Sequence, residues 1–227
     1  MKTQKLKQML SLILAIVMLL TMVPVGSYAA ESTSYPVIKA FTSVAGDFHA
    51  YKTEIVTVTI LDYIDEAEYA ACSPYAWDIS ASSTTGTVKA WMKVNEEETA
   101  AAGATRYDVY IGGSGGVAAN AYSADLFWNF KNLKEIKGLE NFDTSNATNF
   151  SYMFNMCESL ESLDLSSWDT SNATTFLWMF HSCYKLKDLN LSGWDTSSVT
   201  NMNSMFKNCK SLTELSIVDL ETNSVVV

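Results

Sequence analysis

The sequence predicts an α/β fold: a solenoid of strand–loop–helix coils, each 26 residues long, preceded by a mostly β capping segment. The motif that begins at Asp143 returns at Asp169 and Asp195, and a constant step of this size is typical of a repeat architecture. Within each copy, a period of two gives way to a period close to 3.6, which indicates a strand and then a helix. Neither piece buries its apolar face alone, so the copies are expected to stack around a shared core.

Residues 1–29 have the order of a secretory signal peptide. Three lysines precede an apolar run over 12–20, and the small residue Ala29 marks the expected cleavage point. The run is shorter than the roughly 20 residues that a membrane-spanning helix needs. We therefore expect a cleaved leader, no transmembrane segment in the mature chain, and a secreted or cell-surface protein.

Residues 30–121 are predicted to form a β-rich N-terminal capping region. Three runs, 54–61, 88–92 and 107–111, alternate apolar with polar residues or are rich in β-branched residues, as strands are. The polar residues 96–103 are expected to form a loop or a short helix. Stacked repeats need a cover over the apolar end of the first coil, and this region is the candidate for that cover.

Residues 122–227 are predicted to hold about four copies of the repeat, the last one degenerate. The leucines within 160–165 have the L-x-x-L-x-L spacing of a leucine-rich repeat strand. Apolar residues within 150–157 fall at i, i+3, i+4 and i+7, which is one face of a short helix. These helix positions are Phe150, Met153, Phe154 and Cys157.

The Asp-Thr-Ser loop of each copy is expected to form a turn rather than a calcium site. Asp143, Asp169 and Asp195 each supply one carboxylate per copy, whereas calcium takes several oxygen ligands. An aspartate in such a loop accepts a hydrogen bond from its own downstream backbone. Three of the four cysteines recur at one apolar position and are expected to be buried, free thiols.

Composition and motifs limit the function. The 227 residues carry a formal net charge of -10 and contain no cluster of Lys and Arg. Nucleic acid is therefore not expected as a partner, because a phosphate backbone needs such a cluster. The two histidines, His49 and His181, lie in no H-E-x-x-H or G-x-S-x-G motif. We expect no enzyme activity, no metal site and no cofactor, and a solvated His181.

Two groups of outward residues are the candidates for ligand binding. Tyr152 and Trp178 lie off the apolar face of the predicted helix, and an exposed Trp is a typical contact anchor. The other group alternates with the inward leucines of the predicted strands. For both groups the alternative interpretation is an ordinary solvated or packed surface. The strand candidates are Ser162, Asp164, Ser166, Asp188, Asn190, Ser192, Glu214 and Ser216.

The run Leu-Asp-Leu-Ser-Ser-Trp-Asp-Thr-Ser-Asn over 163–172, followed by Met179-Phe180 and Cys183, resembles the BspA-type leucine-rich repeat family of bacterial surface proteins. The resemblance continues upstream and covers about 77–220. It implies an exported, non-catalytic protein that binds protein or glycoprotein partners, on host surfaces or on neighbouring bacteria. Such adhesin-like binding is the function that we expect.

Two alternatives to adhesin-like binding stay open at this point. One is a structural spacer or a truncated fragment of a larger surface repeat array, and the other is an enzyme that acts on polysaccharide. The last coil has no following helix and no polar cap. Because an exposed apolar end commonly marks an interface, we also expect self-association through residues 205–227.

Overall fold

The computed structural model describes residues 36–39, 47–81 and 86–216. The predicted signal peptide, residues 1–29, lies outside these residues. Residues 217–227 of the coil predicted to self-associate lie outside them too.

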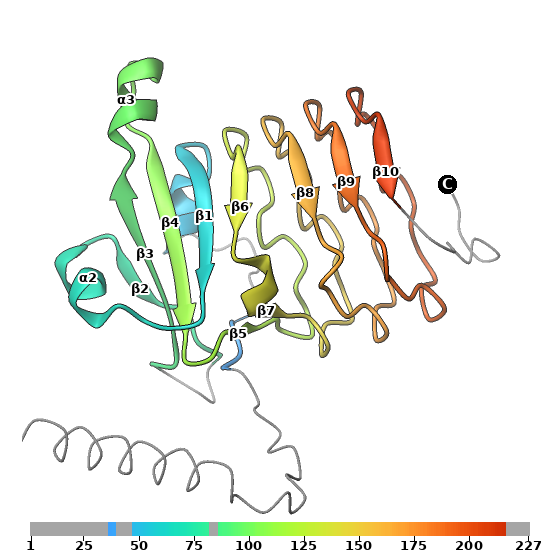
Figure 1. The fold of residues 1–227 in the computed structure, drawn as a ribbon, viewed down its shortest axis with the longest axis horizontal. Helices are drawn as coiled ribbons and strands as arrows, with labels where there is room; N and C mark the ends of the chain where they lie inside the picture. Colours follow the sequence, from blue (N-terminus) through green and yellow to red (C-terminus); the bar gives the residue numbers. More distant parts are fainter. Residues whose placement is uncertain (1–35, 40–46, 82–85, 217–227) are drawn as a thin grey trace, which may run out of the picture. The chain divides into compact units, whose positions relative to one another are not determined.

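A five-stranded sheet occupies the first half of the described chain (Figure 1). Its strands are β1 (Ile55–Leu61), β2 (Ala76–Asp78), β3 (Val88–Val94), β4 (Tyr107–Gly113) and β6 (Glu135–Lys137). The strand order is β2-β3-β4-β1-β6. β3 pairs antiparallel with β2 and β4, whereas β1 pairs in parallel with β4 and β6. The sheet is therefore mixed.

The strands predicted in this region are present, and their alternation comes from burial. In β1, Ile55, Val58 and Ile60 are buried, whereas Thr57 and Thr59 are half-buried. Such β-branched residues suit a pleated surface with one face on a core. The inward residues of the sheet accordingly form the core of this region.

Three short helices accompany the sheet. They are η1 (Phe48–Tyr51), α2 (Glu66–Ala71) and α3 (Glu96–Ala102). α3 begins where Asn95 accepts the backbone N–H of Glu98 at 2.9 Å, which satisfies one of the free donors at a helix start. Gly103 ends α3 in the left-handed conformation. The predicted polar loop or short helix at 96–103 is therefore a short helix.

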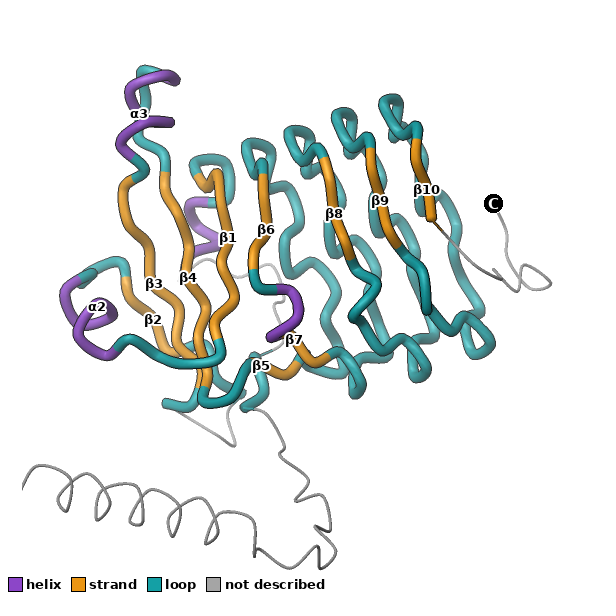
Figure 2. The backbone as a smooth tube through the Cα atoms, in the orientation of Figure 1, coloured by secondary structure: helices purple, strands orange, loops and turns teal. Residues whose placement is uncertain are grey.

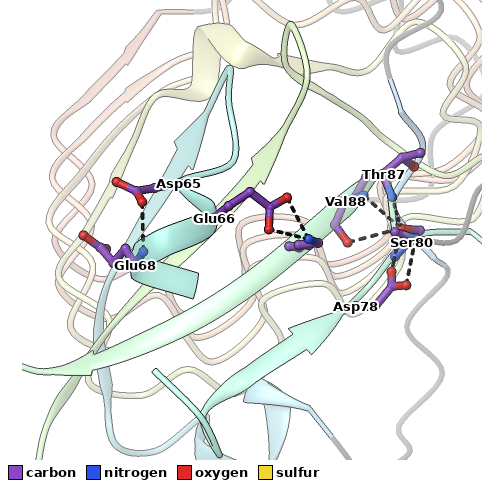
Figure 3. Close-up of polar contacts among 9 residues, drawn as sticks. Asp65, Glu66, Glu68, Asp78, Ser80, Thr87 and Val88 are labelled. Atoms are coloured by element: carbon purple, nitrogen blue, oxygen red, sulfur yellow. Dashed lines mark hydrogen bonds and ion pairs between the residues drawn. The ribbon is translucent and has the colours of Figure 1, made fainter. Parts of the chain in front are cut away.

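Polar contacts join the end of β2 to the start of β3 and hold α2 against β3 (Figure 3). The hydroxyl of Ser80 donates to the Asp78 carboxylate at 2.6 Å and accepts the backbone N–H of Val88 at 2.8 Å. The Lys89 ammonium pairs with the Glu66 carboxylate at 2.7 Å. The polar and charged groups at this end of the β2–β3 pair therefore have hydrogen-bonding partners within the protein.

Gly138 stands where the sheet meets the repeats. Its φ is +73°, and a Cβ atom at this position would meet the carbonyl oxygen of Ile60 at 2.0 Å. A short helix, η2 (Leu139–Asn141), follows at once. Strand β7 (Phe142–Asp143) comes next and pairs in parallel with β5 (Val117–Ala118). Only glycine fits this junction without displacing β1.

Three short strands in successive copies form a separate parallel sheet (Figure 2). They are β8 (Ser162–Asp164), β9 (Asp188–Asn190) and β10 (Glu214–Ser216), in the order β10-β9-β8. Leu163 pairs with Leu189, and both side chains are buried. The strand pairing therefore keeps the 26-residue step of the sequence.

The segment predicted as a helix in each copy is not helical. Tyr152 and Met156 have positive φ angles of 60° and 64°, which a right-handed helix does not allow. The N–H groups of Tyr152 and Phe154 donate to the carbonyls of Leu177 and Met179 in the next copy. No helix follows η2 in the part of the chain that the structure describes.

The predicted fold class is therefore wrong. The described residues form a mixed, sheet-rich fold with few helices. They do not form a regular leucine-rich-repeat-like solenoid of strand–loop–helix coils. The physical reason is that every second backbone donor in the supposed helix bonds to the neighbouring copy. The donors between them, such as those of Met153 and Asn155, bond three residues back in tight turns instead of four residues back as in an α-helix.

The apolar positions of the supposed helix are nevertheless buried. Phe127, Phe154, Phe180 and Phe206 come from successive copies and stack with ring centroids 5.4, 5.5 and 5.8 Å apart. The last two pairs are parallel to within 4°. Met153 beside this stack is also buried. The apolar pattern thus indicates burial correctly, although it gives the wrong backbone conformation.

The Asp-Thr-Ser loops form turns, as predicted. Asp143, Asp169 and Asp195 each accept, at 2.9 Å, the backbone N–H of the residue two positions later. The hydroxyls of the buried Thr144 and Thr170 donate to the carbonyls of Asp169 and Asp195, at 2.9 and 3.0 Å. Each loop is therefore tied to itself, and the first two are also tied to the next copy.

All four cysteines are free in the structure. The thiol of Cys157 donates to the carbonyl of Phe127 at 3.2 Å, and that of Cys183 donates to the carbonyl of Phe154 at 3.1 Å. Burial raises the pKa of both thiols well above the ordinary value, and it raises the pKa of Cys209 to about 11. These thiols therefore remain protonated and act as buried donors between copies.

A buried carboxylate joins the N-terminal segment to the first repeat. Asp47 pairs with the Lys39 ammonium at 2.9 Å and with Nδ1 of His49 at 2.7 Å. Nε2 of His49 lies 2.7 Å from the carbonyl oxygen of Leu126. Burial alone would raise the pKa of Asp47, but hydrogen bonds from His49 and Lys39 and the charge of His49 outweigh it and hold this pKa well below its usual range.

Candidate binding surfaces

The structure gathers the predicted strand candidates on β8 and β9 and on the turns that follow them. Asp164 accepts the backbone N–H of Ser166 at 2.9 Å. Asn190 likewise accepts the backbone N–H of Ser192 at 3.1 Å and its hydroxyl at 2.8 Å. Hydrogen bonds from Ser166 lower the pKa of Asp164. These four side chains therefore close turns, a structural role that sequence analysis did not assign to them.

The remaining strand candidates belong to the strands β8, β9 and β10 themselves. Ser162 and Asp188 face each other across the β8–β9 pairing, and both are exposed. Glu214 and Ser216 belong to β10, but the placement of their side chains lies outside the described part of the structure.

A shallow groove of about 480 Å³ crosses β6, β8 and β9. Four carboxylate side chains line it: Glu135, Glu140, Asp164 and Asp188. Like charges at this density repel anionic ligands. Among the described residues, no group of three or more His, Cys, Asp or Glu side chains is arranged to hold a metal ion. The groove is thus an acidic surface.

A second hollow, of about 590 Å³, lies beside the positive-φ segments of the first copies. We call it the aromatic cleft. Large pockets with aromatic walls and a few polar groups are the usual form of a ligand site. Its main lining residues are Tyr122, Asp125, Trp128, Asn149, Tyr152 and Asn155.

Backbone conformation explains why these side chains point outward. Asp125 and Tyr152 occupy equivalent positions in successive copies, with positive φ angles of 64° and 60°. The neighbouring residues Phe127, Met153 and Phe154 are fully buried. At both positions the left-handed backbone thus places the side chain in the lining of the aromatic cleft, although the neighbouring side chains are buried.

The aromatic surface continues past the cleft into the next copy. The rings of Tyr152 and Trp178 lie 5.9 Å apart, centroid to centroid. Trp178 also packs on the ring of His181, with centroids 4.2 Å apart. Ser204 takes the equivalent position in the following copy, also with positive φ. Tyr152 therefore lines the cleft, and the half-buried Trp178 extends its wall.

The polar groups of the cleft use only part of their hydrogen-bonding capacity within the protein. Asn149 uses its side-chain oxygen to accept the backbone N–H of Ser151 at 2.9 Å. The carboxylate of Asp125 accepts no hydrogen bond from the described residues. Burial raises the pKa of Asp125, although the charges of Lys52 and His49 oppose this effect. These groups keep hydrogen-bonding capacity for a ligand.

His181 lies beneath this surface and is not solvated, contrary to the prediction. Its side chain is buried, and Nδ1 lies 3.2 Å from the side-chain oxygen of Asn155 and 3.2 Å from the hydroxyl of Ser182. Burial lowers the pKa of His181, and the charge of Lys207 lowers it further. A neutral ring under Trp178 supports the wall of the cleft.

Tyr122, Asp125 and Trp128 line the cleft but were not predicted from the sequence. The step between the first two copies is 27 residues, so these three precede Asn149, Tyr152 and Asn155 by one copy. The signal was therefore present, because Asp125 shares the outward position of Tyr152. Without the positive-φ backbone, however, nothing in the sequence places Trp128 beside Tyr152.

Comparison with known proteins gives one match. Residues 124–226 are similar to a protein family described as Mycoplasma protein of unknown function, DUF285. No curated protein and no solved structure matches the chain. The predicted resemblance is thus confirmed only in part: the repeats are similar to a family of unknown function, and the comparisons show no BspA-type leucine-rich repeat. No helix among the described residues is long and apolar enough to cross a membrane.

Proposed function

We propose that this chain is an exported, non-catalytic binding protein that contacts other macromolecules outside the cell, as an adhesin does. The aromatic cleft carries the proposal. A hollow of about 590 Å³ with Tyr122, Trp128 and Tyr152 on its walls is well suited to a ligand, because rigid aromatic side chains supply much of the binding energy at interfaces.

The roles of the two histidines support a non-catalytic protein. Both ring nitrogens of His49 face acceptors, the Asp47 carboxylate and the Leu126 carbonyl. His181 is buried under Trp178 and bonds to Asn155. General-base catalysis requires a histidine within reach of the proton that it abstracts. In this protein both rings serve packing and hydrogen bonding.

The order of the first 29 residues supports export. N-terminal sequencing of protein from the culture medium is expected to begin at Ala30 or Glu31. A product that retains Met1 would contradict export while leaving the binding proposal open to its own test.

The binding proposal is tested with purified protein expressed from the full sequence. Saturable binding is measured to intact bacterial cells and to wells coated with extracellular matrix glycoproteins. We expect binding to at least one surface, weakened about tenfold or more in the double variant Trp128→Asn and Tyr152→Ser. Asn and Ser are the residues found at these positions in later copies, Asn155 and Ser204, so the backbone tolerates both.

Tyr63→Ser is the matched control for this experiment, because Tyr63 is exposed and lies outside the cleft. Its binding should equal that of the unmodified protein. The absence of saturable binding to either surface would favour a structural spacer. Equal binding by the double variant would place the binding surface elsewhere.

A further inference from the structure

We propose that the aromatic cleft binds a neutral saccharide chain. In this arrangement sugar rings lie against Trp128 and Tyr152, and their hydroxyl groups bond to Asp125 and to the amides of Asn149 and Asn155. The inference deepens the proposed function and rests on it, since it names the chemical class of the ligand.

The lining of the cleft combines apolar ring faces with polar hydrogen-bonding groups, and a sugar ring combines the same two kinds of surface. A pyranose presents patches of C–H bonds on its faces and hydroxyl groups around its edge. Flat aromatic rings pack against the C–H faces and keep a polar atom for the edge, as Tyr and Trp do at wet interfaces. Tyr122, Trp128 and Tyr152 provide such rings in the lining of one hollow.

The polar groups match the hydroxyl edge. Asp125 offers a carboxylate that no described residue bonds, and a carboxylate accepts from two hydroxyls at once. Asn155 is 4% exposed, lines the cleft, and has its side-chain oxygen held by His181. Its amide nitrogen has no partner among the described residues, so it remains as a donor. This nitrogen is not among the buried side-chain atoms that lack a partner, so it is open to the cleft and to a ligand in it.

A peptide ligand fits the cleft less well. Peptides that bind along a sheet need free backbone donors and acceptors from the protein. Here the N–H of Asp125 donates to Ser151, and the N–H of Tyr152 donates to Leu177. The backbone around the cleft is thus occupied between copies, and recognition falls to side chains.

Charge favours a neutral saccharide over an acidic one. The cleft lining includes the carboxylate of Asp125 and no cationic side chain, and the whole chain has a formal net charge of -10. The ammonium of Lys52 lies 4.1 Å from the centroid of the Trp128 ring, which holds the ring in place. Sulfated or carboxylated chains would be repelled at long range.

The continuing aromatic row favours a chain over a single sugar. Trp178 follows Tyr152 with ring centroids 5.9 Å apart, so a second ring can stack one copy further along. The row ends at Ser204. A ligand of several sugars would therefore run across the copies, parallel to the direction in which they repeat.

Native gel electrophoresis through soluble polysaccharides tests the proposal directly. The probes are mannan, galactomannan, xyloglucan and dextran, with alginate as the acidic polymer. We expect at least one neutral probe to retard the protein and alginate to leave it unretarded. Trp128→Asn, Tyr152→Ser and Asp125→Asn should each weaken retardation about tenfold or more, whereas Tyr63→Ser should not change it.

A second measurement uses the unmodified protein and so does not depend on the variants folding. Trp128 should be protected from oxidation by N-bromosuccinimide when the retarding polysaccharide is present, as read by peptide mass spectrometry. Retardation by no neutral probe, by alginate alone, or without protection of Trp128 would overturn the saccharide assignment. If the protein still binds cells or matrix in that case, the proposed function stands and the ligand is of another class.

Discussion

Strands β3 and β4 pair over seven residues, whereas β8 and β9 pair over three. In the sheet region, backbone pairing between distant segments is concentrated in one mixed sheet. In the repeats, backbone pairing between copies is divided among several short segments of each copy. Besides the short strands, single bridges join Tyr122 to Asn149, Asn149 to Thr175, and Thr175 to Asn201.

The side chains of the two regions differ in the same way. Core residues of the sheet have mixed partners on neighbouring strands: Val58 lies between Val109 and Ile136, and Val109 lies between Val58 and Met92. Core residues of the repeats pack against the same residue type in the neighbouring copies, as Phe154 does against Phe127 and Phe180. Stability in the repeats therefore comes from contacts with the same residue type on both sides of a core side chain. A substitution there should disturb two interfaces at once.

The largest expected effect tests this idea at the centre of the repeats. Trp168 is buried and packs on the rings of Phe142, Phe150 and Phe154. Trp168→Ala should lower the free energy of unfolding by about 4 kcal/mol, measured by urea denaturation. Trp178→Ser, on the outer surface, should cost about 1 kcal/mol. Equal losses would show that the copies are not stabilised through this aromatic core.

The next largest effect tests the junction between the two regions. Gly138→Ala should cost about 3 kcal/mol, because it adds a strained backbone to a clash with the Ile60 carbonyl. Gly193 also has positive φ, but a Cβ there would come no closer than 3.7 Å to another residue. Gly193→Ala should therefore cost about 1 kcal/mol. A tolerated Gly138→Ala would mean that β1 and the repeats can shift relative to each other.

Removal of the Asp47 charge should weaken the contact between the N-terminal segment and the first repeat. The resulting loss of stability should depend on pH. Because the folded pKa of Asp47 lies below its unfolded value of 3.8, the stability that it contributes is complete above that value and is lost as pH falls through the folded pKa. Asp47→Asn should cost about 2 kcal/mol at pH 7. The difference between the two proteins should begin to shrink as the pH falls below about 4, and it should disappear only well below pH 3, where the folded pKa is passed. A difference that is the same at every pH would contradict the ion pair with Lys39.

Two tryptophans, one in each region, differ in whether the indole N–H has a hydrogen-bond acceptor. The indole N–H of Trp91 in the sheet donates to the Glu68 carboxylate at 2.7 Å. That of Trp168 has no acceptor among the described residues. Trp91→Phe should cost about 1.5 kcal/mol more than volume loss alone. Trp168→Phe should cost about 1 kcal/mol in total, since Phe142 takes the same position one copy earlier.

The smallest effect concerns thiol reactivity rather than stability. Cys72 and Cys209 are partly accessible, whereas Cys157 and Cys183 are buried. At pH 8 a thiol reagent should modify Cys72 first and Cys209 more slowly, because burial raises the pKa of Cys209 to about 11. Cys157 and Cys183 should react only after unfolding. Recovery of a disulfide-linked peptide containing both would refute free thiols.

The strands of the sheet were predictable from the sequence, and the backbone of the repeats was not. Alternation in 54–61 has one structural explanation, a strand with one buried face. The spacing i, i+3, i+4 and i+7 in 150–157 has two, because a segment with a left-handed residue at every fourth position buries the same side chains. Tyr152 and Met156 occupy those positions, and neither Tyr nor Met is a residue type that predicts a positive φ.

The candidate site was predictable to a similar extent. Tyr152 was identified because it falls outside the apolar pattern. Asp164 and Asn190 were assigned to a ligand because they alternate with buried leucines, yet they cap the turns after β8 and β9. A short polar side chain near a strand end can do either, and only the backbone geometry decides.

The hydroxyls of Thr144 and Thr170 bond to carbonyls one copy away and to nothing more distant. A gene duplication that adds one whole copy would carry both the donor and the acceptor of this contact, so it would leave the register of its neighbours intact. The aromatic cleft lies at the beginning of the series, at Tyr122 and Tyr152. Copy number could then change during evolution at the far end while descendants keep the same aromatic cleft.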